Sequence, residues 1–142
     1  MAGDIFQMCN VIRQTSLALY RYLRGGHMEK VYEKGLLHRL SKQGLKVQAQ
    51  HPLTVCDEDG TLLGNYYADL FVEDCLIVEL KTCDAPANAH IGQLLGYLRA
   101  SSIEHGMLIN FGPGRFEIRK FILSGKGLHE EPESKDGRKS MP

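Results

Sequence analysis

The chain has 142 residues, of which 43% are hydrophobic and 24% are charged, with 17 basic and 17 acidic side chains. This composition predicts one soluble globular domain and excludes a chain that is disordered throughout. No window approaches the ~18–20 uninterrupted apolar residues of a membrane-spanning helix, and the first residues lack the basic and apolar run of a secretory signal. We therefore expect a cytoplasmic protein.

The first 44 residues show helical periodicity. One helix is predicted over residues 4–23, with Asp4 as its N-cap. A second helix is predicted over about residues 28–42, with Gly44 well placed at its C-terminal cap. Apolar residues recur at three- and four-residue spacing in both segments, so each helix should pack one face against a core.

Strand patterns begin after Lys46. Three strands, one further helix and two more strands are predicted, in the order 47–55, 62–72, 75–81, 88–100, 106–111 and 116–123. The third strand is apolar enough to be central in a sheet and covered on both faces. The helix after it joins two buried strands, which should therefore be parallel neighbours connected by a right-handed crossover.

The last part of the sequence changes character. From Ser124 the chain is rich in Gly, Glu, Lys, Ser and Pro, so residues 124–142 are predicted to form a disordered tail. Residues 1–123 are then predicted to form a single α/β domain with the element order αα-βββ-α-ββ.

Three charged residues occupy positions where apolar strands should carry none. Glu79 and Lys81 end the most apolar strand and point to one face, because side chains alternate along a strand. Asp69 lies on the preceding strand. A three-residue turn at 73–75, or a bulge, would place Asp69 opposite Glu79, whereas a two-residue turn would pair Asp69 with Val78 and turn the side chains apart.

These three residues allow a structural and a chemical interpretation. In the first, Lys81 forms an internal ion pair with Glu79 or Asp69 that holds the sheet edge. In the second, the two carboxylates bind Mg²⁺, which usually takes one or two carboxylates plus waters and substrate phosphate. The ion would activate the water that attacks a phosphodiester, while Lys81 orients that water and stabilises the transition state.

The same residues resemble a known nuclease signature. Asp69-(x9)-Glu79-Leu80-Lys81 is similar to the D…(D/E)-x-K pattern of the PD-(D/E)XK nuclease superfamily. Gly-His-Met-Glu-Lys-Val-Tyr at residues 26–32 resembles the G-x-x-E-x-x-Y motif of the small bacterial GxxExxY proteins assigned to that superfamily. The resemblance covers roughly residues 20–123 through further matching segments at 64–70, 77–81, 90–98 and 108–112.

The resemblance implies a restriction-endonuclease-like fold, in which a mixed central sheet with an α-β-β-β-α-β core is flanked by helices. It implies that Asp69, Glu79 and Lys81 form the catalytic centre. Glu29, from an early helix, would face the metal directly or through water, and Gln93 would complete the site from the helix after the active-site strands. The metal ligands would be Asp69, Glu79 and Glu29, and the ion Mg²⁺ or Mn²⁺.

Other residues of these motifs have simpler interpretations. Tyr32 and Tyr97 are predicted to be core residues with hydrogen-bonded hydroxyls, and His90 to be a helix cap or a surface group. Tyr67 departs from the family, which carries an arginine at this position. The four cysteines have no metal-ligand spacing and are predicted to be free thiols.

We therefore interpret the chain as a Mg²⁺-dependent nuclease that hydrolyses phosphodiester bonds of DNA. A homodimer or a larger complex would widen the small surface that one copy offers to a duplex. The alternative is a non-catalytic module with this fold that binds nucleic acid or a protein partner. The intact set of Asp69, Glu79 and Lys81 argues for catalysis.

Overall fold

The computed structural model of the chain describes residues 4–132. Its helices and strands follow in the order α1 (Ile5–Leu23), α2 (Glu29–Lys42), β1 (Val47–Cys56), β2 (Leu62–Val72), β3 (Leu76–Lys81), α3 (Asn88–Ser101), β4 (His105–Phe111), β5 (Phe116–Ser124) and β6 (Gly127–Glu131). Asp4 caps α1 by accepting a hydrogen bond from the backbone N–H of Phe6 at 2.9 Å, as predicted. Within the described residues, no helix is both long and apolar enough to cross a membrane.

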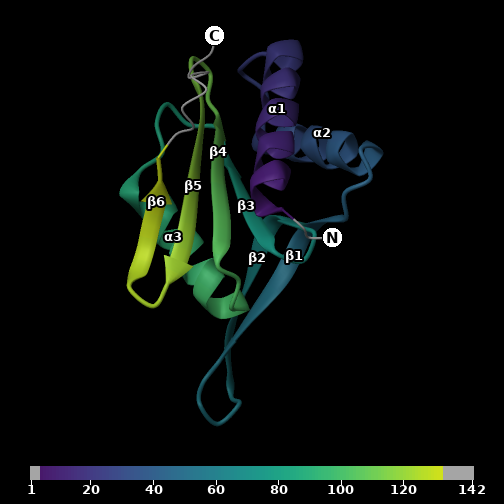
Figure 1. Cartoon of the computed structure of the whole chain (residues 1–142). Coiled ribbons are helices and arrows are strands. Elements are labelled where there is room, and N and C mark those ends of the chain that lie inside the picture. The colour runs from purple at the N-terminus through teal and green to yellow at the C-terminus, as the bar shows by residue number, and fades with distance from the viewer. Residues whose placement is uncertain (1–3, 133–142) are drawn as a thin grey trace.

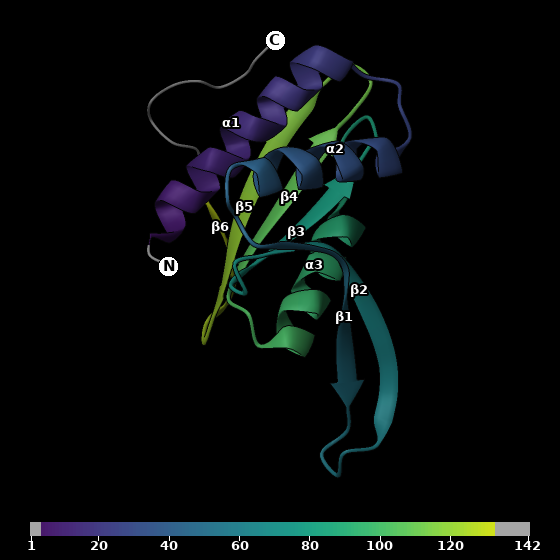
Figure 2. The same ribbon diagram turned by 90° about the vertical axis from the view of Figure 1, so that its right-hand side faces the viewer.

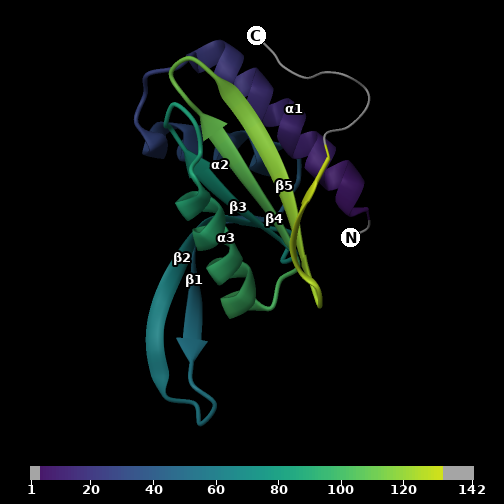
Figure 3. The same cartoon turned by 90° about the vertical axis from the view of Figure 1, so that its left-hand side faces the viewer.

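The strands form one mixed sheet in the order β1-β2-β3-β4-β5-β6 (Figure 1). Neighbouring strands are antiparallel except for β3 and β4, which are parallel and connected through α3. The predicted parallel pairing of these two strands is confirmed. Figure 2 shows α1 and α2 over one face of the sheet, and the opposite view in Figure 3 shows α3 over the other.

Each face of the sheet has its own apolar core. On the α1/α2 face, Tyr32 is fully buried and stacks on Phe111, with ring centroids 4.6 Å apart. The Tyr32 hydroxyl donates a 2.5 Å hydrogen bond to the carbonyl of Arg24, which confirms the predicted core role of this tyrosine. On the α3 face, Leu94 and Leu98 of the helix pack against the sheet. Burial of such leucines stabilises the fold by about 1.5–3 kcal/mol each.

The structure corrects the predicted tail at residues 124–142. Its first part forms β6, which pairs with β5 and packs Leu128 against the α3-side core. Arg119 of β5 binds Glu130 of β6 through two hydrogen bonds of 2.8 and 2.7 Å. The strand was missed because polar contacts hold it, and these leave little apolar pattern in the sequence. Residues 133–142 lie outside the described part of the chain.

The hairpin of β1 and β2 projects beyond the body of the protein (Figures 1–3). Its turn is closed by a 2.8 Å hydrogen bond from the N–H of Asp57 to the carbonyl of Thr61. The outer half of β2 is exposed, whereas Ala68 and the four residues after it are buried between the two helical layers. The change from exposed to buried residues therefore falls between Tyr67 and Ala68, just before Asp69.

Candidate active site

The register of β2 and β3 places Asp69 opposite Glu79. Val72 pairs with Leu76, so the turn at 73–75 has three residues, which is the condition that the chemical interpretation requires. The ladder between the two strands ends two pairs further on, at Leu70 and Val78. Asp69 and Glu79 follow at the point where the strands separate, and we call this point the strand fork.

Side-chain carboxylates take over the backbone hydrogen bonds at the strand fork. The N–H of Asp69 donates to Oε2 of Glu79 at 2.9 Å, and the N–H of Leu80 donates to Oδ2 of Asp69 at 2.8 Å. Both side chains are buried, with 9% of Asp69 and 3% of Glu79 exposed. Each carboxylate is thus oriented by the backbone of the opposite strand, which holds two acidic groups side by side.

This arrangement makes it costly for both carboxylates to be charged without a cation. Burial and the nearby charge of Asp69 raise the pKa of Glu79 to about 8, although the hydrogen bond from the Asp69 backbone and the charge of Lys81 act in the opposite direction. A bound cation would remove this cost, because it would compensate the second negative charge.

The side chains of β1 change from one face of the sheet to the other at Gln50. Ala49 packs on the α1/α2 side of the sheet, whereas the ring of His51 contacts Phe71, which belongs to the α3-side core. Residues two apart on a strand normally share a face. Gln50 adopts a φ of 52°, in the left-handed region that non-glycine residues rarely occupy, and so allows the reversal.

β2 reverses at the partner position, Asp69. Ala68 packs on the α3 side and Leu70 on the α1/α2 side. The site therefore lies where β1 and β2 both change faces, with α2 on one side of the sheet and α3 on the other.

Gln50 and Glu33 support Asp69 from the α2 side. Nε2 of Gln50 donates to Oε1 of Glu33 at 3.0 Å and to Oδ1 of Asp69 at 3.3 Å. Glu33 is buried and is paired with Lys30 at 3.3 Å. Sequence reasoning missed both residues. The signal for Glu33 was its place one turn after Glu29, whereas the left-handed backbone of Gln50 has no local sequence signal.

Glu29 lies at the same side of the site. It is half-buried, and its pKa is raised first by burial and then by the charge of Asp69, while Lys81 lowers it. However, residues 4–132 contain no group of three or more His, Cys, Asp or Glu side chains arranged to hold a metal ion. The role of Glu29 as a ligand therefore stays a prediction.

Lys81 and Gln93 are brought together from the α3 side. Nζ of Lys81 donates to Oε1 of Gln93 at 3.0 Å, and Nε2 of Gln93 donates to the hydroxyl of Tyr97 at 3.1 Å. At the start of α3, Nδ1 of His90 accepts a 3.0 Å hydrogen bond from the N–H of Ala87, so His90 caps the helix, which is one of the two roles predicted for it.

Asn110 of β4 fixes the chain just beyond Lys81, its partner in the parallel ladder. The Asn110 side chain is fully buried and bonds both backbone groups of Cys83, accepting from the N–H at 3.0 Å and donating to the carbonyl at 2.8 Å. Gly112 is required nearby, because a Cβ there would collide with the Cys83 carbonyl. These contacts fix the backbone of the segment that follows Lys81.

The oxygen atoms at the strand fork fit a divalent cation. Among the described residues, Oε1 of Glu79 has no hydrogen-bond donor, and Oδ1 of Asp69 has only the amide of Gln50. Carboxylate oxygens are the ligands that Mg²⁺ prefers, and it commonly takes only one or two from the protein. Asp69 and Glu79 thus provide a suitable donor pair.

The protonation of Glu79 should be visible in the stability of the metal-free protein. Between pH 4.5 and about 8 the folded state holds a proton on Glu79 that the unfolded state releases. The free energy of unfolding should therefore fall with rising pH, by at most about 1.4 kcal/mol per pH unit for this group.

Urea titrations of wild type and Glu79→Gln in EDTA would isolate this contribution from those of other titrating groups. The variant should gain stability relative to wild type as the pH rises from 5 to 8. Parallel curves over that range would contradict the raised pKa of Glu79.

Comparison with known proteins assigns the family. Residues 6–121 match the family model of the PD-(D/E)XK nuclease superfamily. The crystal structure of SSO0001 is similar in fold, with a TM-score of 0.53 and 21% sequence identity over 64% of this chain and 48% of that one, so this chain spans about half the length of SSO0001. No curated protein matches the chain. The predicted restriction-endonuclease-like fold is confirmed, and the chain belongs to the PD-(D/E)XK nuclease superfamily.

Proposed function

We propose that the protein is a cytoplasmic, Mg²⁺-dependent nuclease that hydrolyses phosphodiester bonds of DNA, and that its motif at residues 26–32 places it among the GxxExxY proteins. The observation that carries the proposal is the pair of buried carboxylates, Asp69 and Glu79, held side by side at the strand fork with Lys81 two residues beyond. Superfamily membership supports it, because PD-(D/E)XK nucleases generally use divalent metal ions.

Each site residue has a role in this proposal. Asp69 and Glu79 hold Mg²⁺ or Mn²⁺ through oxygens that their backbone hydrogen bonds leave available, and Glu29 adds a ligand directly or through water. When bound, the ion supplies an acidified water and compensates charge that develops on the phosphate. Lys81 orients the water and stabilises the transition state with its ammonium group, while Gln93 holds Lys81 in place.

The contacts of Lys81 favour this chemical interpretation over the structural ion pair. Its hydrogen-bond partner in the described part of the chain is the neutral amide of Gln93, and no ion pair within 4.0 Å joins it to either carboxylate there. A lysine that served only to neutralise the two carboxylates would contact them directly. For a duplex substrate, a second copy of the chain would widen the binding surface.

Two substitutions should separate metal binding from catalysis. Glu79→Ala removes a ligand and should abolish both Mn²⁺ binding, measured by calorimetry, and cleavage of mixed DNA substrates. Lys81→Met should retain metal binding but lower the cleavage rate by about 100-fold or more, because it removes transition-state charge stabilisation. Lys34→Met, an exposed lysine on α2, is the matched control and should behave as wild type. If wild type binds no metal even with DNA present, the chain is a binding module and the nuclease proposal fails.

Gln50 should matter for metal affinity more than for stability. Gln50→Gly suits the left-handed backbone, so the free energy of unfolding should change by no more than about 1 kcal/mol. Loss of the amide that orients Asp69 should weaken Mn²⁺ binding about tenfold, as outer contacts of metal ligands commonly do. Gln48→Ala, on the same strand, is the control. Equal Mn²⁺ affinity in Gln50→Gly and wild type would contradict the positioning role of Gln50.

A further inference from the structure

Large exposed apolar side chains lie next to the candidate active site. Tyr66 and Tyr67, which immediately precede the buried part of β2, are 39% and 52% exposed. Met28 and Val31, at the beginning of α2, are exposed as well. Exposed apolar side chains that gather near a site often mark where a ligand binds.

Tyr66 is connected to the catalytic lysine through α3. Its ring stacks on Tyr97 with centroids 5.1 Å apart and planes 28° from parallel. The hydroxyl of Tyr97 accepts from Gln93, which in turn accepts from Lys81. Tyr66 thus presents a partly exposed aromatic ring that packs against a second ring. Three contacts, through Tyr97 and Gln93, connect it to Lys81 of the proposed reaction centre.

α3 carries a glycine, Gly96, where it approaches the Tyr66 ring. A Cβ added at Gly96 would lie 4.0 Å from the Tyr66 ring, and one added at Gly92 would meet nothing within 4 Å. α3 therefore approaches the Tyr66 ring at Gly96 without a side chain between them, and Tyr97 of the same helix stacks on the ring. A planar ligand would stack on the part of the ring that these contacts leave exposed.

The stretch of chain that contributes Asp69, Glu79 and Gln93 is acidic. Residues 51–105 contain two basic and nine acidic residues, and three of the acidic ones, Asp57, Glu58 and Asp59, are exposed at the tip of the hairpin. Binding of duplex DNA depends largely on Lys and Arg contacts to phosphates. Only Lys81 and Arg99 could supply such contacts from this stretch.

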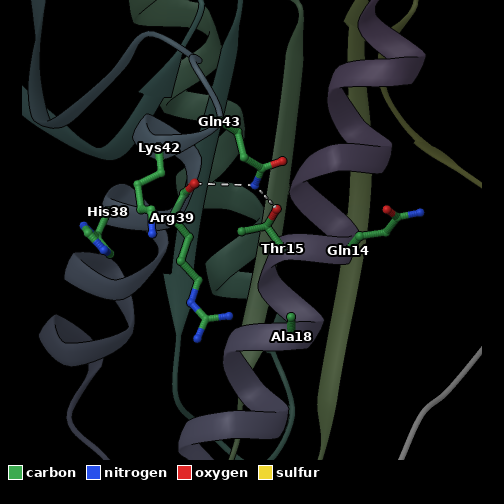
Figure 4. Close-up of a pocket in the computed structure, with 7 residues that line it drawn as sticks. All are labelled: Gln14, Thr15, Ala18, His38, Arg39, Lys42 and Gln43. Atoms are coloured by element: carbon green, nitrogen blue, oxygen red, sulfur yellow. Dashed lines mark hydrogen bonds between the residues drawn. The ribbon is translucent and has the colours of Figure 1, made fainter.

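A basic cavity of about 520 Å³ lies elsewhere, between α1 and α2. Figure 4 shows His38, Arg39 and Lys42 lining it from the second half of α2. These residues follow Glu29 by 9–13 positions, or about 14–20 Å along the helix at 1.5 Å per residue. This basic cavity is therefore remote from the carboxylates.

We infer that the active site takes single-stranded DNA and that an unpaired base stacks on Tyr66. Base–aromatic stacking is tolerant of sequence and adds to the binding that phosphate contacts give, which matches an exposed aromatic ring beside the proposed reaction centre. A single strand also fits one copy of the chain without the wider surface that a duplex would need. This inference deepens the proposed function and takes DNA as the substrate from it.

Fluorescence anisotropy with labelled (dT)12 and a 12-base-pair duplex, in EDTA so that no cleavage occurs, tests the inference. The single strand should bind at least tenfold more tightly than the duplex. Its affinity should depend weakly on salt, with a log–log slope of about −1.4 or shallower, as two phosphate contacts would give. Tyr66→Ala should weaken single-strand binding by about 5- to 150-fold, whereas Tyr66→Phe should retain it.

Tyr22→Ala is the matched control, because Tyr22 is an exposed tyrosine on α1. It should bind (dT)12 as wild type does. Equal or tighter binding of the duplex, unchanged binding in Tyr66→Ala, or no binding of either DNA would overturn the inference, as would loss of binding only on substitution of Arg39 and Lys42. If single-strand binding follows Tyr66 but no metal-dependent cleavage is found, the proposed nuclease activity fails and the stacking surface stands.

Discussion

The strand fork is the constraint on which the rest of the site depends. Two antiparallel strands stop pairing through their backbones, and the carboxylates of Asp69 and Glu79 accept the N–H groups that the ladder leaves behind. Buried backbone donors must find acceptors, so these hydrogen bonds fix both side chains. The same hydrogen bonds bring two acidic groups together under burial, which favours a proton or a cation at the site. The hydrogen bonds that satisfy the backbone where the strands separate thus also position two carboxylates for a metal ion.

The surrounding elements hold the strand fork from three directions. From α2, Glu33 accepts a hydrogen bond from Gln50, which also donates to Asp69. The left-handed backbone of Gln50 lets the side chains of β1 change faces opposite Asp69. From α3, Gln93 contacts Lys81, and β4 fixes the following segment through Asn110. The site is therefore built on helices and strands, which hold functional groups more firmly than loops do.

Much of the fold could be predicted, because hydrophobic periodicity acts locally. Both strands of the site were located in this way, but the length of the turn between them stayed open, and the three residues of the folded turn set Asp69 against Glu79. Gln50 could not be found in this way, since nothing in a strand pattern announces a non-glycine residue with positive φ. β6 was missed for a related reason: ion pairs such as Arg119–Glu130 depend on partners that only the folded sheet brings together. Hydrophobic periodicity in the sequence could not indicate these non-local polar contacts.

The most direct test of the metal site is anomalous diffraction from crystals of the protein soaked in Mn²⁺ near pH 8, which is close to the raised pKa of Glu79. We expect one strong anomalous peak between Asp69 and Glu79, with an oxygen of each carboxylate as ligand, and loss of that peak in Glu79→Gln. A map without a peak at the strand fork, or with the ion bound instead in the cavity beside His38, would contradict the account.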